Sequence, residues 1–177
     1  IMGLGVMGSD SAMRLRDLGF KVAGWSRNRR RIDGVHCYAG EAEFEAFLGR
    51  TDILVSLLPH TPATNGIINR ETIRKLSRKG PFGAPIVINA GRGKQQVEGD
   101  ILAALDSGEL YAATLDVFVT EPLPQESPLW VHPKVTVTPH CAADSDPETI
   151  SAYVLRQIRR HEAGQPLENL VDRARGY

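Results

Sequence analysis

Three glycines near the start of the chain, Gly3, Gly5 and Gly8, constrain its fold more than any other feature of the sequence. In the stretch GLGVMG, the first glycine permits a tight turn, the second lets another group approach the backbone, and the third lets a helix pack close to a strand. The helix that follows such a turn directs its free N–H groups at an anion such as a pyrophosphate. The pattern therefore predicts a phosphate-binding loop, which includes Val6 and Met7, at the start of a helix.

The rest of the chain alternates short apolar runs with amphipathic stretches. Helical patterns cover 9–18, 96–107 and 147–162, and the first two end at a glycine, which suits a helix C-terminus. The apolar runs are β-branched, are bounded by turn residues, and are typical of buried parallel strands. They lie at 21–25, 52–58, 85–90, 112–118 and 135–139. This order predicts an α/β fold with a Rossmann-like, doubly wound parallel sheet.

Length and composition predict one main domain without a large electrostatic field. The chain has 177 residues, 42% of them hydrophobic, with 21 basic and 21 acidic side chains. This balance argues against a nucleic-acid or anionic-membrane partner, and no apolar run approaches the roughly 20 residues of a membrane span. The two cysteines have neither metal-ligand spacing nor a disulfide framework. We expect a cytoplasmic protein without a metal site.

The expected domain organisation is a dinucleotide-binding domain at 1–150, followed by a C-terminal helix and polar tail at 151–177. The glycine loop stands at the very start of the chain, where a preceding strand would be expected. The sequence therefore reads as part of a longer protein.

The residues after the second expected strand indicate which dinucleotide would bind. A ribose with a free 2′-hydroxyl is usually held by a carboxylate at this position, but the chain has Ser26 and Arg27 there. A serine hydroxyl can donate a hydrogen bond to a 2′-phosphate, and a guanidinium can pair with it. Arg29 lies close enough in sequence to assist, whereas Arg30 and Arg31 are interpreted as solvated surface residues. The pattern favours NADPH over NADH.

Four chemically capable residues follow later strands: Arg92, Asp116, Glu121 and His140. In an open parallel sheet, ligands bind beyond the carboxyl ends of the strands, so these side chains are expected to converge on one cleft. Reduction of a small 2-oxo acid needs a cation for the substrate carboxylate, a hydride donor and a proton donor for the carbonyl oxygen. The arginine and the histidine provide the cation and the proton donor, and a nicotinamide provides the hydride.

Glu121 suits a supporting role toward the histidine. Free histidine has a pKa of about 6.5, and a neighbouring carboxylate favours the charged imidazolium. The hypothesis is therefore a general acid, His140, kept protonated by Glu121, with Arg92 orienting the oxo acid.

Five ordered motifs give the chain a family likeness. GLGVMG, LLPHTPATNGIIN, NAGRG, LDVFVTEPLP and TPHCAA together resemble the D-isomer-specific 2-hydroxyacid dehydrogenases. The phrases EPLPQESPLW and VDRARGY are similar to the NADPH-preferring glyoxylate and hydroxypyruvate reductases within that family. The resemblance implies that Arg92, Glu121 and His140 form the catalytic trio.

The same resemblance implies further cofactor contacts. Leu58 and Pro59 would line the adenosine side, Ala90 would face the nicotinamide ribose, and Asp116 would hold the nicotinamide carboxamide. An aspartate in this place can also serve only as a buried hydrogen-bond acceptor. Family members are commonly homodimers with a second, substrate-binding domain, most of which precedes the glycine loop.

Two other classes remain open at this point. The opening of the chain also resembles β-hydroxyacid dehydrogenases, although these continue into an all-helical domain, and the strands expected at 112–118 and 135–139 argue against that. A non-enzymatic corepressor that senses a dinucleotide is the second alternative, since such a protein can keep the same residues.

Overall fold

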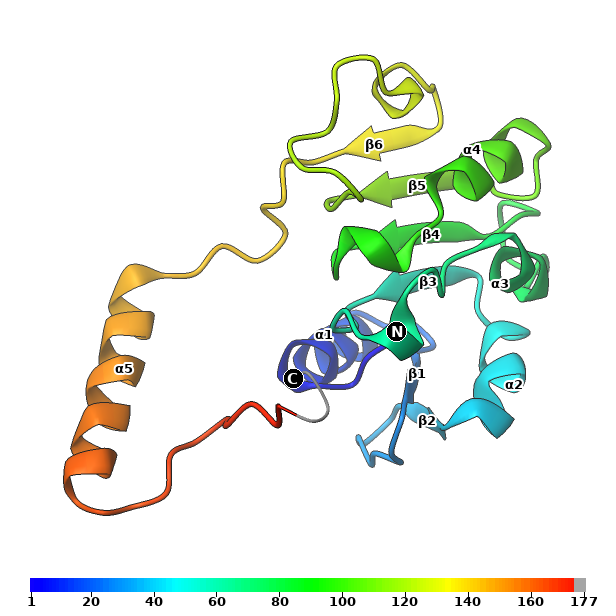
Figure 1. Ribbon diagram of the computed structural model, residues 1–177. Coiled ribbons are helices and arrows are strands. Elements are labelled where there is room, and N and C mark those ends of the chain that lie inside the picture. Colours follow the sequence, from blue (N-terminus) through cyan, green and yellow to red (C-terminus); the bar gives the residue numbers. More distant parts are fainter. Residues whose placement is uncertain (174–177) are drawn as a thin grey trace. The chain divides into compact units, whose positions relative to one another are not determined.

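The structure, a computed structural model, describes residues 1–173 of the 177 (Figure 1). It divides the chain into two compact units, Ile1–His140 and the segment from Cys141 onward. This division falls ahead of the expected boundary at residue 150, and the helix at 147–162 crosses that boundary. Residues 174–177, the end of the VDRARGY motif and of the expected tail, lie outside the described residues.

The first unit is built on parallel strands (Figure 1). They are β1 (Ala23–Ser26), β2 (His36–Ala39), β3 (Ile53–Ser56), β4 (Ile86–Asn89), β5 (Ala112–Leu115) and β6 (Val135–Val137). β1 pairs with β2, and β3 to β6 pair in chain order. Met2 forms parallel bridges with Trp25 and with Ser56, so the segment at 1–3 lies between β1 and β3. The order β2-β1-(1–3)-β3-β4-β5-β6 confirms the predicted doubly wound parallel sheet.

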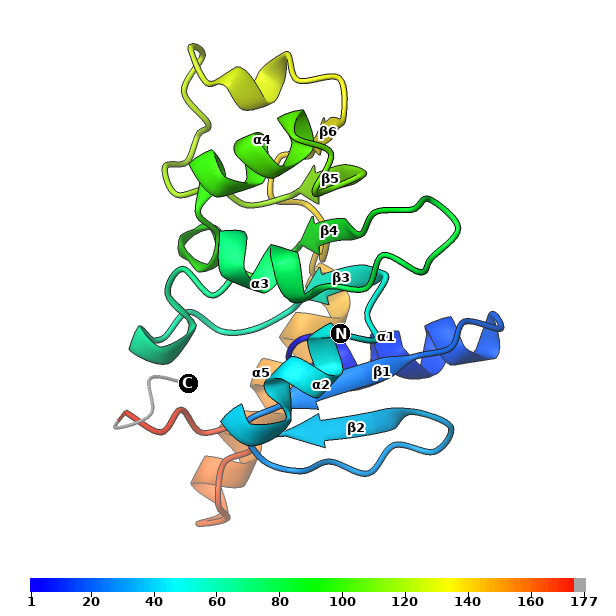
Figure 2. The same ribbon diagram turned by 90° about the vertical axis from the view of Figure 1, so that its right-hand side faces the viewer.

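Helices cover both faces of this sheet. They are α1 (Val6–Asp17), α2 (Phe44–Leu48), α3 (Arg70–Lys75) and α4 (Glu98–Asp106). Figure 2 shows α2, α3 and α4 along one face, where Phe47, Ile73 and Ile101 are fully buried in the main core. A smaller cluster around Leu4 and Ala12 packs α1 on the sheet separately. The unit therefore has three layers, with α1 on one face of the sheet and α2, α3 and α4 on the other; of these four helices, α1 and α4 were predicted from the sequence.

Some elements differ from the sequence prediction. β2 was not predicted, because His36–Ala39 is a short edge strand without clear apolar alternation. α2 and α3 have only five and six residues, too few to display a helical period. α1 begins at Val6 rather than residue 9, because Gly5 is its N-cap, and α4 begins at Glu98 rather than residue 96.

Short 3₁₀ turns complete the loops of the first unit. They are η1 (Glu41–Glu43), η2 (Pro62–Thr64), η3 (Gly93–Gln95) and η4 (Pro128–Trp130).

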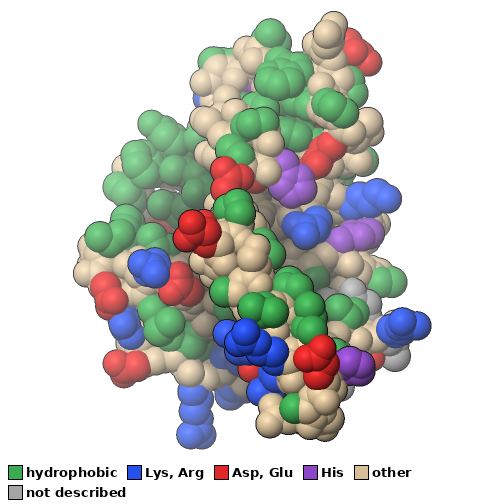
Figure 3. Space-filling view, turned by 90° about the vertical axis from the view of Figure 1, so that its left-hand side faces the viewer, with side chains coloured by type: hydrophobic (Ala, Val, Ile, Leu, Met, Phe, Trp, Pro, Cys, Tyr) green, Lys and Arg blue, Asp and Glu red, His purple; other side chains and the backbone are tan. Residues whose placement is uncertain are grey.

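The second unit consists of α5 (Pro147–Glu162) and the segment after it. The side chain of Asp146 accepts a hydrogen bond from the Thr149 amide and caps the helix, as Asp commonly does. No residue of α5 is buried, and hydrophobic side chains of the helix are visible among charged ones in Figure 3. The helix predicted at about 147–162 is confirmed.

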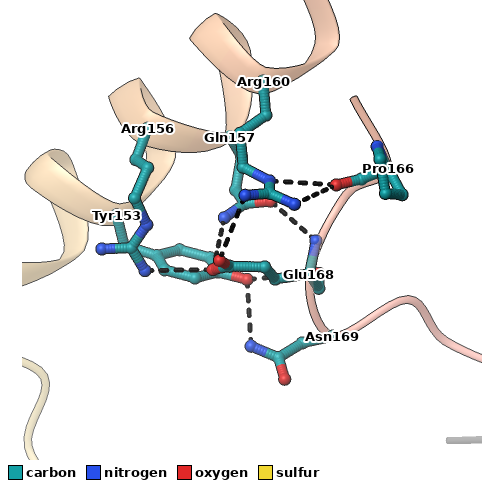
Figure 4. A network of polar contacts seen from close by, with 7 residues as sticks. All are labelled: Tyr153, Arg156, Gln157, Arg160, Pro166, Glu168 and Asn169. Atoms are coloured by element: carbon teal, nitrogen blue, oxygen red, sulfur yellow. Dashed lines mark hydrogen bonds and ion pairs between the residues drawn. The ribbon is translucent and has the colours of Figure 1, made fainter. Parts of the chain in front are cut away.

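A polar network around Glu168 folds the tail back along α5 (Figure 4). The Glu168 carboxylate accepts hydrogen bonds from Arg156 at 3.1 Å and from Gln157 at 2.9 Å. The Gln157 side chain also accepts from the Glu168 amide, and Arg160 donates to the Pro166 carbonyl. These contacts hold the pKa of Glu168 below its usual range, chiefly through the bond from Arg156.

Candidate active site

The glycine loop joins the segment at 1–3 to α1 in a turn that requires glycine at Gly3 and Gly8. Gly3 has a φ of 98°, in the left-handed region that disfavours other residues. A Cβ on Gly8 would lie 1.7 Å from the Gly3 carbonyl oxygen, so the helix can approach the turn only without that side chain. A Cβ on Gly5 would meet nothing within 4 Å. The open backbone at Gly5, ahead of the first N–H groups of α1, fits a bound pyrophosphate.

Val6 and Met7 follow in the first turn of α1, where they are 83% and 52% exposed. These exposed apolar side chains flank the free N–H groups at the start of the helix, where no carboxylate stands. The first turn of α1 holds no acidic residue. An anion therefore meets no like charge within that turn.

Ser26 and Arg27 leave the sheet at the end of β1, beside the glycine loop. The Ser26 hydroxyl, which the sequence reading treats as a donor to a phosphate, instead donates to the Asn28 carbonyl oxygen at 2.8 Å and is nearly buried. This hydrogen bond spans the turn that contains Arg27, and Arg27 is exposed. Donation from Ser26 to a phosphate would require this hydroxyl to rotate away from Asn28.

Arg29 is bound to the neighbouring edge strand. Its guanidinium donates to the Cys37 carbonyl oxygen at 3.1 Å and forms an ion pair with Glu43. Glu43 also accepts from the Ala39 amide, and the pKa of Glu43 is lowered first by that amide and then by Arg29. A hollow of about 430 Å³ lies beside this group. It is lined by Arg29, Arg30, Arg31, Ile32, Asp33, Val35 and Cys37.

The segments after β3 and β4 lie at the same edge of the sheet. Leu58 is buried and Pro59 half-buried, and their carbonyl oxygens accept from Gln95 at 2.6 Å and from Thr64 at 2.8 Å. Ala90 is half-buried, and its amide donates to Ser56. These backbone bonds fix the wall beside the glycine loop, where the sequence predicts the adenosine and ribose contacts.

The histidine and the glutamate meet as predicted. His140 Nδ1 lies 2.8 Å from Glu121 Oε2, and the two side chains are 49% and 37% exposed. Glu121 Oε1 accepts from the Phe118 amide at 2.9 Å. His140 follows β6 with a φ of 54°, a strained value for a residue with a side chain, and its amide donates to the Asp116 carbonyl. A residue stays in such a conformation only where surrounding contacts hold it, here the bonds to Asp116 and Glu121.

The positive charge of Arg92 acts on Glu121 of this pair. The pKa of Glu121 is lowered first by the hydrogen bond from Phe118, then by the bond to His140, and to a smaller extent by the positive charge of Arg92. Arg92 is exposed at the N-cap of η3, and its guanidinium donates to the Gly91 carbonyl at 2.7 Å. The three residues predicted to act together thus come from the ends of three neighbouring strands.

Asp116 is nearly buried between β5 and β6. Its carboxylate accepts from the Thr138 hydroxyl at 2.5 Å, which matches the interpretation as a buried acceptor. Through its carbonyl oxygen it also holds the amide of His140. Asp116 therefore has a structural part in the site, whatever it contacts in a bound cofactor.

Two consecutive glutamines, Gln95 and Gln96, are buried beside the site and were not predicted as site residues. Gln96 was predicted to begin the helix at 96–107. In the structure both side chains point into the sheet edge and bind the loops that carry site residues. The signal available in the sequence was a pair of adjacent glutamines three and four positions after a predicted catalytic arginine.

Within residues 1–173, no group of three or more histidine, cysteine, aspartate or glutamate side chains is arranged to hold a metal ion. Over the same range, every helix is too short or too polar to cross a bilayer.

The chain matches known proteins throughout its length. Residues 1–142 match the family model of the D-isomer specific 2-hydroxyacid dehydrogenase NAD binding domain. Over all 177 residues the chain is 50% identical to the glyoxylate/hydroxypyruvate reductase A of Salmonella newport, and covers 55% of that protein. The chain thus spans little more than half the length of this curated relative.

Solved structures agree with these matches. An NADPH-dependent glyoxylate/hydroxypyruvate reductase from Sinorhizobium meliloti, in complex with NADP and sulfate, has 57% identity and a TM-score of 0.97. A probable 2-hydroxyacid dehydrogenase from Rhizobium etli, in complex with NADP, has 49% identity and a TM-score of 0.94. The chain is covered to 99% in both comparisons and covers 55% of each structure's chain. The matches favour this family over β-hydroxyacid dehydrogenases and corepressors.

Proposed function

The chain belongs to the D-isomer-specific 2-hydroxyacid dehydrogenase family, and we propose that it is the cofactor-binding and catalytic portion of an NADPH-dependent reductase of small 2-oxo acids. The reaction would convert glyoxylate to glycolate and hydroxypyruvate to D-glycerate. The hydrogen-bonded His140–Glu121 pair, beside the charge of Arg92, is the observation that carries this proposal.

The residues divide the chemistry among them. Arg92 pairs with the carboxylate of the oxo acid and fixes its orientation. Glu121 occupies His140 Nδ1, so the other ring nitrogen, Nε2, holds the proton that passes to the carbonyl oxygen. Bound NADPH supplies the hydride for the carbonyl carbon and leaves as NADP⁺. Hydride and proton together reduce the carbonyl to a hydroxyl.

The proposed cofactor contacts follow the strand ends. The loop containing Gly3, Gly5, Val6, Met7 and Gly8 would hold the pyrophosphate, and Ser26, Arg27 and Arg29 would surround the 2′-phosphate. Leu58 and Pro59 would line the adenosine, and Ala90 and Asp116 the nicotinamide half. The open backbone at Gly5 and the exposed Arg27 support this placement.

Two further proposals concern the location and the assembly of the full-length protein. By family resemblance we propose that the full-length protein is cytoplasmic and assembles as a homodimer. Light scattering on the purified full-length protein would give its mass, and a monomer at micromolar concentration would contradict the second statement.

The direct test is steady-state reduction of glyoxylate and of hydroxypyruvate by the full-length protein, with NADPH and NADH compared. His140→Ala should slow reduction by about 10² to 10⁴ with NADPH affinity unchanged, because the proton donor is lost and the cofactor contacts remain. His161→Ala, which changes an exposed histidine on α5, is the matched control and should keep the parent rate. A fully active His140 variant would refute the assignment of the acid.

A further inference from the structure

A continuous chain of side-chain amides links the loop of Arg92 to the loop after β5. The Gly91 amide donates to Asn89 Oδ1 at 3.1 Å. Asn89 Nδ2 donates to Gln96 Oε1 at 2.7 Å and to the Arg92 carbonyl at 3.3 Å. Gln96 Nε2 then donates to the Val117 carbonyl at 2.9 Å. Asn89 is fully buried and Gln96 is 2% exposed, so water does not compete for these bonds.

The loop after β5 is held at a second point by α4. Glu98, the first residue of that helix, accepts from the Val119 amide at 2.9 Å. Between the two points, a Cβ on Gly93 would lie 1.7 Å from the Phe118 carbonyl oxygen, so the two loops are in direct backbone contact. The Phe118 amide, which belongs to the same peptide group as the Val117 carbonyl, donates to the Glu121 carboxylate.

From these contacts we infer that Gln96 and Glu98 are positioning residues, which clamp the loop at 117–121 onto the loop of Arg92. This inference rests on the proposed function. The clamp fixes the distance between the group that holds the substrate carboxylate and the His140–Glu121 pair that protonates its carbonyl. Misplacement of catalytic groups by about 1 Å can cost about 10²-fold in rate.

Gln95 provides a matched comparison. Like Gln96 it is a buried glutamine with a satisfied amide, but its bonds run to the other side, toward Ser56 Oγ at 2.9 Å and the Leu58 carbonyl at 2.6 Å. Its one contact with the Arg92 amide is long, at 3.4 Å. Loss of a buried amide should destabilise the fold in either case, whereas only Gln96 reaches the loop of Glu121.

The first experiment compares Gln96→Met with Gln95→Met in the full-length protein, since methionine keeps the volume and removes the side-chain hydrogen bonds of either glutamine. We expect similar losses in Tm. In Gln96→Met, hydrogen exchange should become faster both at the amides of 117–121 and at those of 91–93, and kcat should fall by about 10- to 100-fold with NADPH affinity kept. In Gln95→Met, exchange at 117–121 should stay at the parent rate.

The second experiment uses Glu98, which is partly exposed and can be changed without opening the core. Glu98→Ala removes the acceptor for Val119 and should lower kcat by about 3- to 10-fold, with faster exchange at 117–121. Glu98→Gln keeps an acceptor oxygen and should restore both values. An effect of packing alone would not distinguish the two variants in this way.

Unchanged exchange at 117–121 in both Gln96→Met and Glu98→Ala would overturn the inference, as would equal effects of the Gln95 and Gln96 variants on that loop. The exchange readout does not depend on turnover. If the parent protein reduces neither oxo acid but exchange at 117–121 and 91–93 still becomes faster in Gln96→Met, the clamp is supported and the proposed reaction is rejected.

Discussion

Glu121 uses its two carboxylate oxygens for different purposes. Oε1 accepts a hydrogen bond from the Phe118 amide and fixes the loop. Oε2 is hydrogen-bonded to His140 Nδ1 and fixes the imidazole. Both bonds favour the ionised form and hold the pKa of Glu121 below its ordinary value. A single residue thereby links the geometry of the loop to the orientation of the proposed acid.

The pH dependence of stability follows from this shift. Because the pKa of Glu121 is lower in the folded than in the unfolded protein, its contribution is complete above the unfolded value of about 4.3 and is lost as pH falls through the folded value. Glu121→Gln should therefore be less stable than the parent at pH 7, and the difference in Tm should shrink below about pH 4. Glu126→Gln, in an exposed loop, is the control. A Tm difference that persists unchanged at low pH would contradict this prediction.

Arg27 tests the choice of cofactor at the residue scale. Arg27→Asp should lower NADPH affinity by about 10- to 100-fold, the value of one charge-assisted hydrogen bond of about 1.5–3 kcal/mol, while NADH affinity is kept. Fluorescence titration with both cofactors measures this difference. Arg31→Asp makes the same charge change nearby and should have a small effect. Equal losses in the two variants would indicate general electrostatics rather than a specific contact.

At the scale of elements, two glycines in the turn before α1 have different roles: Gly8 is needed for packing, and Gly5 leaves space for a ligand. Gly8 is required for packing, because a side chain there would collide with the Gly3 carbonyl. Gly5 caps the helix with a φ of −74°, which other residues adopt, and faces open space. The spacing that identifies the loop therefore has two different physical causes.

We expect Gly8→Ala to lower Tm strongly, whereas Gly5→Ala should cost under about 1 kcal/mol, the usual range for a helix N-cap. Gly5→Ala should nevertheless reduce NADPH affinity by at least about 10-fold, because its methyl group would take the space of the pyrophosphate. Thermal melts and titrations of the two variants decide the matter. Normal NADPH binding by Gly5→Ala would place the phosphates elsewhere.

At the scale of the whole molecule, the chain combines two units of different character. The first has an extensive apolar core, whereas the described part of the second is a single helix held to its own tail by polar contacts around Glu168. Exposed ion pairs of this kind contribute little stability and are screened by salt. The tail should therefore open independently of the sheet.

Glu168→Ala should speed hydrogen exchange in 165–169 without a change in the strands of the first unit, since its contacts lie within the second unit. In the parent, the protection factor of these amides, which is the intrinsic exchange rate at each pH divided by the observed rate, should fall below about pH 4, where the carboxylate becomes protonated. Exchange of β3 and β4 is the internal control. A simultaneous change in those strands would show that the two units unfold together.

The sequence by itself determined the parallel α/β architecture, the glycine turn ahead of α1 and the order of the catalytic candidates. Glycine spacing and apolar periodicity are local properties, and parallel strands bring their carboxyl ends to one edge whatever the details of packing. For this reason Arg92, Glu121 and His140 could be predicted as one group, and the pair His140–Glu121 is observed.

Only the tertiary structure decided which partners the polar side chains choose. Arg29 turns to Glu43, which lies 14 positions further along the chain, and Gln96 turns to Val117, which lies 21 positions further. A buried amide must find a hydrogen-bond partner, but which one it finds depends on loops that meet only after the sheet has formed. Local sequence patterns therefore predicted which residues belong to the candidate site, and contacts between distant segments decide how those residues are aligned.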